Sequence, residues 1–269
     1  MKTVNICQEN LAFGARKSIA GIENIDMDII MSELVVLPCD GDEVIVEMYF
    51  GNPHHLSRFK VNVVQNGNTI HIELKKARIF LVVSPVINVI TRVFIPKDYQ
   101  NNILVNGISL NTAIQEINAN NINVSLVSGR CMLNQVKATN LQINSVSGNV
   151  QINEIYSDTV SIESKSGTVL FENMHLNHPD AMNTSLYIDS ISGKVDAFVR
   201  DCLNNIRIKT ISGAVSLTVP SDYQFNSHCN CISGKVKTNS GRSTMAGVNN
   251  HKQNTVDINT ISGSITINN

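Results

Sequence analysis

Two acidic residues and a lysine stand at equivalent positions in successive repeats of this sequence. Glu163, Asp189 and Lys209 each lie four residues before the glycine of a Ser-Gly pair. If the repeats stack, these side chains become neighbours, and two carboxylates could then coordinate a cation or act as the acid and base of a polysaccharide enzyme. The alternative is an exposed ladder whose repulsion is relieved by Lys209 and solvent. The three residues are the candidate binding residues under either interpretation.

A second cluster, His228-Cys229-Asn230-Cys231, contains residue types that bind zinc. Alternation along a strand sends His228 and Cys229 to opposite faces, and no second Cys/His pair has zinc spacing. The cluster therefore predicts buried thiols. Glycine-rich nucleotide loops, nucleophile elbows and calcium nonapeptides are missing from the sequence. We expect no catalytic residue, no metal site and no cofactor.

Seven Ser-Gly pairs organise the elements that must position these residues. Their glycines follow one another at intervals of 19, 19, 26, 20, 21 and 29 residues, and a period near 20 is typical of stacked repeats. We expect each glycine to form a corner that leaves no room for a Cβ atom or needs a backbone angle that glycine adopts cheaply. The corner glycines are Gly129, Gly148, Gly167, Gly193, Gly213, Gly234 and Gly263.

Apolar and polar residues alternate around each glycine, as in a half-buried strand. The positions seven and five before it, and two and four after it, are mostly apolar and β-branched, so we expect them to face the core. The position two before it is apolar in every repeat except at Lys165, and we expect it to face inward as well. Because the positions five and two before the glycine are an odd number of residues apart, both can face inward only if the strand bends or bulges at the small residue three before the glycine.

A single repeat is too small to be stable alone. Five buried apolar side chains contribute roughly 10 kcal/mol, whereas ordering about 20 residues costs on the order of 30 kcal/mol. Stacked coils share their core and backbone hydrogen bonds with two neighbours. The sequence therefore predicts an all-β fold, a β-solenoid in one continuous domain. Regular Ser-Gly coils occupy residues 101–269, and irregular β coils or a cap occupy residues 1–100, with a hairpin at Asn66-Gly67.

The composition excludes several classes of partner. The net charge is −1 without a basic cluster, which argues against nucleic acid, and no apolar run approaches the length of a membrane span. Six scattered cysteines favour buried free thiols over a disulfide framework. With no secretory signal evident, these features favour a cytoplasmic location. Asparagine is abundant and can stack in ladders along a solenoid.

The strand-Ser-Gly-strand units, such as the stretch from Leu141 to Ile152, resemble those of the bacterial putative-adhesin family of β-strand repeats, a family of unknown function. The element Val93-Phe94-Ile95-Pro96 resembles one found in the same family. The resemblance covers roughly residues 20–269. It implies a right-handed single-stranded β-helix, often associated with the cell envelope, and it supplies no catalytic residues.

We therefore expect a non-enzymatic, adhesin-like interaction or scaffold protein whose partner is a protein or a glycan. The alternative is a carbohydrate-active enzyme that uses carboxylates on adjacent coils. The strand that starts at Ile265 is expected to form the uncovered end of the stack. Because open strand edges favour pairing, we expect either a homo-oligomer through the C-terminal coil or a polar cap made by Asn268 and Asn269.

Overall fold

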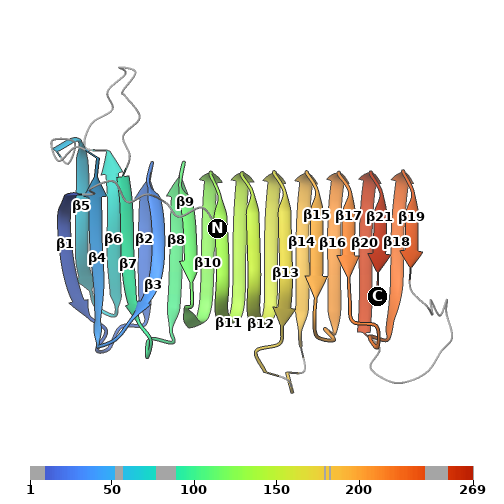
Figure 1. The fold of residues 1–269 in the computed structure, drawn as a ribbon, viewed down its shortest axis with the longest axis horizontal. Helices are drawn as coiled ribbons and strands as arrows, with labels where there is room; N and C mark the ends of the chain where they lie inside the picture. Colours follow the sequence, from blue (N-terminus) through green and yellow to red (C-terminus); the bar gives the residue numbers. More distant parts are fainter. Residues whose placement is uncertain are drawn as a thin grey trace.

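The chain folds into a long stack of β-coils, seen side-on in Figure 1. The computed structural model describes residues 10–51, 57–76, 89–178, 180–181, 183–239 and 254–268. Within these ranges, twenty-one strands join in one sheet and no α-helix forms. The predicted all-β solenoid is confirmed.

The regular coils lie directly above one another. The strands β10 (Asn118–Ser128), β11 (Cys131–Ser147) and β12 (Val150–Ser166) pair in parallel. Each coil bends at its Ser-Gly pair, and β11 and β12 run on through a second bend, at which Gln135 and Glu154 have φ angles of 53° and 51°. The other strands of the regular coils are β8 (Asn102–Ile108), β9 (Asn111–Gln115), β13 (Val169–His175), β14 (Ser185–Ser192), β15 (Val195–Val199), β16 (Asn205–Ser212), β17 (Val215–Thr218), β18 (Phe225–Ser233), β19 (Val236–Asn239), β20 (Asn254–Ser262) and β21 (Ile265–Asn268).

The N-terminal strands extend the same sheet. At this end β1 is antiparallel to β4 and β5 is antiparallel to β6. The Asn66-Gly67 pair forms the predicted hairpin between β5 and β6, and Gly67 has the left-handed φ of 59° that such a turn requires. The strands of this part are β1 (Asn10–Ser18), β2 (Asn24–Ile30), β3 (Glu33–Cys39), β4 (Glu43–Phe50), β5 (Phe59–Asn66), β6 (Thr69–Lys76) and β7 (Val89–Pro96).

The order of the coils departs from the order of the chain at both ends. Near the N-terminus, β2 lies between β6 and β8, and β3 lies between β7 and β9. Near the C-terminus, β20 lies between β16 and β18, and β21 lies between β17 and β19 (Figure 1). The expectation that the strand starting at Ile265 forms the uncovered end was therefore wrong. That end is formed by β18 and β19, and Ile265 is fully buried. Asn268 lies within β21, away from the end, and Asn269 falls outside the described residues.

The core is a continuous stack of aliphatic side chains. In one coil, Leu141, Ile143, Val150 and Ile152 are at most 1% exposed. Outside the core, Asn140 donates a hydrogen bond to Asn121 in the preceding coil at 2.8 Å, and Asn121 donates to Asn102 at 2.7 Å, so asparagines stack in a ladder.

The residue two positions before each corner glycine faces solvent, so the prediction that it faces inward was wrong. The strand alternation continues without a bulge, so the small residue three before the glycine faces inward instead: Ser145, Ser164, Ser190, Thr210 and Thr260 are buried. The space inside the corner is limited. Leu126 is the residue three before Gly129, and its partner in the neighbouring coil is Gly107. A Cβ atom added to Gly107 would lie only 2.8 Å from the Leu126 side chain. Lys165, which occupies the position two before its corner glycine, is exposed like its aliphatic equivalents.

Candidate functional site

The Ser-Gly corners form one row along the stack. The N–H of Gly148 donates to the carbonyl of Ser166 at 3.0 Å, and the same bond recurs from coil to coil. The corner glycines have φ angles between 117° and 155°. A Cβ atom on Gly148 would lie 1.7 Å from the carbonyl oxygen of Gly129. Both the backbone angle and the close approach therefore require glycine at this corner. The row ends in the order Gly213, Gly263, Gly234, because the last two coils are exchanged.

The structure places the three candidate binding residues side by side. Glu163 pairs with Asp189, and Asp189 pairs with Lys209, so the insertion after β13 does not shift the register. All three side chains are exposed on the outer face of the sheet. No hydrogen bond or ion pair joins them in the described part of the chain. An acid–base pair is normally enclosed with its substrate; this exposed position suits a charge ladder instead.

The cysteine cluster lies on the terminal coil. Cys231 donates from Sγ to the carbonyl of Gly263 at 3.1 Å, while His228 is exposed. Cys229 is half-buried, and this burial raises the pKa of its thiol. Among the described residues, no three His, Cys, Asp or Glu side chains are arranged to hold a metal ion.

The other cysteines are also free wherever the structure describes them. Cys131 is fully buried, and its desolvation raises the pKa of the thiol to about 12. Cys202 is exposed, contrary to the expectation of buried thiols, because it lies in the loop between β15 and β16. Cys7 falls outside the described residues.

An exposed row of aliphatic side chains follows the glycine corners. These residues occupy the position two before each glycine, and Ile108 takes the equivalent place beside Val127, because Gly107 pairs with Leu126. The row is interrupted by Lys165, between Val146 and Ile191. The members of this aliphatic row are between 43% and 81% exposed: Ile108, Val127, Val146, Ile191, Ile211, Ile261 and Ile232.

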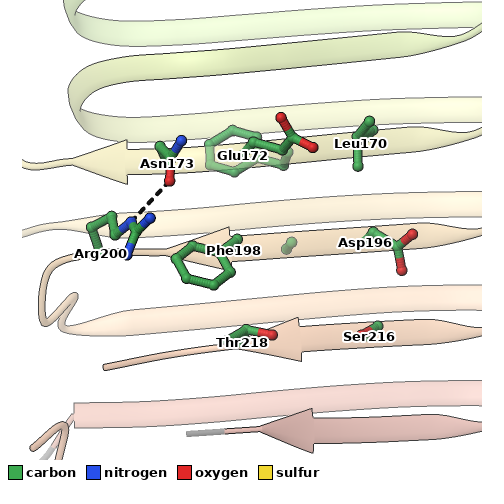
Figure 2. Close-up of a pocket in the computed structure, with 10 residues that line it drawn as sticks. Leu170, Glu172, Asn173, Asp196, Phe198, Arg200, Ser216 and Thr218 are labelled. Atoms are coloured by element: carbon green, nitrogen blue, oxygen red, sulfur yellow. Dashed lines mark hydrogen bonds between the residues drawn. The ribbon is translucent and has the colours of Figure 1, made fainter. Parts of the chain in front are cut away.

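A hollow of about 290 Å³ lies on another outer surface of the stack, over β13, β15 and β17 (Figure 2). Nε of Arg200 donates to Oδ1 of Asn173 at 2.8 Å, and its guanidinium carbon lies 4.3 Å from the centre of the Phe198 ring. Asn173 has a φ of 55°, within a register shift between β13 and β15. The hollow is lined by Leu170, Phe171, Glu172, Asn173, Asp196, Ala197, Phe198, Arg200, Ser216 and Thr218.

Sequence reasoning missed this hollow. One signal could have found it: Phe198 stands five residues after its corner glycine, at a position held by Asn134 and Asn153 in earlier coils. An aromatic residue in an outward-facing polar column is the kind of departure that marks a binding surface.

A stack of parallel coils with a continuous row of Ser-Gly corners defines a β-solenoid repeat protein. The chain belongs to the family described as Toastrack DUF4097, whose sequence profile matches residues 22–268. This match confirms the family resemblance that the Ser-Gly repeats indicate.

Several solved structures of bacterial proteins are similar to this chain at low sequence identity. One, named "putative lipid binding protein", from Parabacteroides distasonis, has a TM-score of 0.56 at 16% identity, with 95% of this chain and 96% of that one covered. A "putative adhesin" from the same species has a TM-score of 0.49 at 13% identity, with 97% and 98% covered. A "putative adhesin" from Bacteroides fragilis has a TM-score of 0.43 at 12% identity, with 95% and 96% covered. A comparison with curated proteins found no match. Within the described ranges, no helix has the length and apolarity needed to cross a bilayer.

Proposed function

We propose that this chain is a non-enzymatic, adhesin-like interaction module that binds a protein partner along the aliphatic row. The exposure of this row carries the proposal. Its seven members contribute little to the core, since each is at least 43% exposed, so polar residues at these positions would cost the core little. Contiguous exposed apolar surface of this kind marks interaction sites.

The row also has a defined length and spacing. With about 4.8 Å between strands, the seven intervals from Ile108 to Ile232 span roughly 34 Å. Burying the exposed half of each side chain contributes about 1 kcal/mol, or about 7 kcal/mol in all, before the entropy cost of association. The row alone therefore supports a moderate or transient interaction, in which charged neighbours supply the specificity.

The charges around the row indicate the chemistry of the partner. Lys165 lies within the row, and the position after the glycine carries the exposed residues Arg130, Lys194 and Lys235. Glu163 and Asp189 lie on the other flank, where Lys209 follows Asp189 in the next coil. A protein whose own apolar strip is bordered by carboxylates on one side would match this surface.

Site-specific photocrosslinking in the native cells tests the proposal. A photoreactive residue at Ile211 should capture a protein that is not captured from Arg207, an exposed position on the same strand. Ile191→Asp and Lys165→Glu should each abolish that adduct without changing the thermal stability. Equal labelling from both positions, or an adduct that survives both substitutions, would exclude the row as the binding surface.

Self-association through the terminal coil is a second candidate. Val236 is 43% exposed, whereas Ile265 in the adjoining coil and Val215 in the coil beyond it, at the same position, are at most 1% exposed. A sheet edge left open in this way favours pairing with another strand. Sedimentation of the purified protein should show a concentration-dependent dimer that Val236→Lys removes. A monomer at all concentrations would refute this candidate.

We also propose a cytoplasmic location. The support is the free state of the five described cysteines, which suits a reducing compartment. Alkylating the thiols in intact cells with a membrane-permeant and with an impermeant reagent distinguishes this location from the cell surface.

A further inference from the structure

The hollow over β13, β15 and β17 contains hydrogen-bonding groups of both kinds. The carboxylates of Glu172 and Asp196 accept hydrogen bonds, whereas the guanidinium of Arg200 donates them. Lys194 lies 2.6 Å from Asp196, but a carboxylate has about four acceptor sites and retains capacity for a ligand. The hydroxyls of Ser216 and Thr218 can act in either role.

The same hollow has an apolar element. Phe198 is half-buried, and Figure 2 shows its ring along β15, between Arg200 and Asp196. Leu170 adds an aliphatic side chain from the neighbouring strand. Binding sites for small ligands combine such apolar surface with a few placed polar groups. Leu170, Asp196 and Phe198 project from paired strands. Arg200 directly follows β15, where its backbone N–H donates to the carbonyl of Met174. This backbone pairing places the groups before a ligand arrives.

These features favour one class of ligand. Two carboxylates in the lining disfavour an anion, and the described residues offer no set of ligands for a metal ion. An extended peptide that adds to a sheet needs an open edge, but β15 is paired on both sides, with β13 and β17. A saccharide has a ring face of C–H groups and a rim of hydroxyls that both donate and accept hydrogen bonds. That combination matches an aromatic ring surrounded by mixed donors and acceptors.

We propose that this hollow binds a neutral saccharide unit of a glycan. The face of the Phe198 ring that Arg200 does not cover packs against the sugar, the carboxylates of Glu172 and Asp196 accept from its hydroxyls, and Arg200 donates to its oxygens. Its stacking on Phe198 and its bond to Asn173 hold the Arg200 guanidinium in place. This site is separate from the aliphatic row, so each can fail without the other.

The affinity should be weak for one sugar. A hexose has about 12 non-hydrogen atoms, which at ordinary ligand efficiency corresponds to a Kd of about 1 mM or weaker. An oligosaccharide that also contacts Ser216 and Leu170 on the adjoining strands should bind more tightly than its monomer.

The test is an array of neutral oligosaccharides, with sulfated and sialylated glycans for comparison, followed by titration calorimetry on the neutral glycan that binds best. Phe198→Ala should weaken binding at least tenfold, and Glu172→Gln and Arg200→Ala should each weaken it severalfold. The matched controls are Tyr187→Ala and Arg207→Ala, which remove an exposed aromatic ring and an exposed guanidinium from strands of the other surface. Both controls should leave the affinity unchanged.

Three results would overturn the proposal: no binding of any neutral glycan, a preference for the acidic glycans, or equal losses in the Phe198 and Tyr187 variants. Circular dichroism and melting temperature confirm that each variant is folded. A failure here leaves the photocrosslinking test of the aliphatic row untouched, because that test reads out a protein adduct.

Discussion

Replacing a corner glycine in the middle of the stack should destabilise the whole protein. In Gly193→Ala the new Cβ atom would lie 2.0 Å from the carbonyl oxygen of Gly167. That carbonyl belongs to the neighbouring corner, so it cannot move without disturbing the adjoining coil. The residue must also hold a φ of 129°, which L-residues rarely adopt. Strained backbone costs about 1–3 kcal/mol, and overpacking adds about 1–3 kcal/mol.

Two other glycines separate these contributions. Gly41 has a φ of 98°, but a Cβ atom at this residue would have no neighbour within 4 Å, so Gly41→Ala should show the backbone cost alone. Gly14 has neither constraint, and Gly14→Ala should be neutral or slightly stabilising. At about 2–4 °C per kcal/mol, we expect Gly193→Ala to lower the Tm by roughly 5–20 °C, with Gly41→Ala in between. The reasoning is refuted if Gly193→Ala melts within 1 °C of Gly14→Ala in thermal scans followed by circular dichroism.

Three further outcomes are expected. Ile211→Asn in the aliphatic row should leave the Tm almost unchanged. Ile208 lies three residues earlier and is fully buried, so Ile208→Asn should lower the Tm by several degrees in the same melt, because the substitution buries an unpaired amide. Equal effects of the two substitutions would contradict the assigned faces. Raising the pH from 8 to about 10.5 should lower the Tm. Burial raises the pKa of Cys131 to about 12 and also raises the pKa of Tyr223, so both groups ionise more readily in the unfolded chain than in the folded one. Cys131→Ala should therefore reduce the decline. A maleimide should modify Cys202 in the native protein within minutes and Cys131 only after denaturation, as read by peptide mass spectrometry.

Much of the architecture follows from the spacing of the Ser-Gly pairs. The period predicts stacked coils, and the alternation around Gly148 correctly places Ile143 and Val150 in the core. The error concerns Val146 and its equivalents, whose apolar character alone predicts an inward orientation. The alternation of the strand places Ser145 inside instead, where the narrow corner accepts a small side chain. Hydrophobicity alone does not decide the face of a residue that lies next to a sharp bend.

Other features lie beyond a reading of single repeats. The coils have nearly equivalent edges, so no local pattern indicates that β20, and not β18, is the strand that pairs with β16. Phe198 in a polar column marks the place of the hollow, but its full lining does not follow from single repeats, because it combines side chains from three strands whose registers are fixed only in the stack. The adjacency of Glu163 and Asp189, in contrast, follows from their shared column.

The exchanged order of the last two coils has a consequence for biosynthesis. The ribosome synthesises β18 and β19 before β20 and β21. In the folded stack, however, β20 and β21 lie between the coil of β16 and β17 and the coil of β18 and β19. The free edge of β16 and β17 therefore meets a neighbour that is not its final one while translation is still under way. In a nascent chain that stalls before residue 254, the edge of β16 and β17 lacks its final partner. The corresponding segment of another polypeptide can pair with that edge by the same register, which is a route to intermolecular strand exchange.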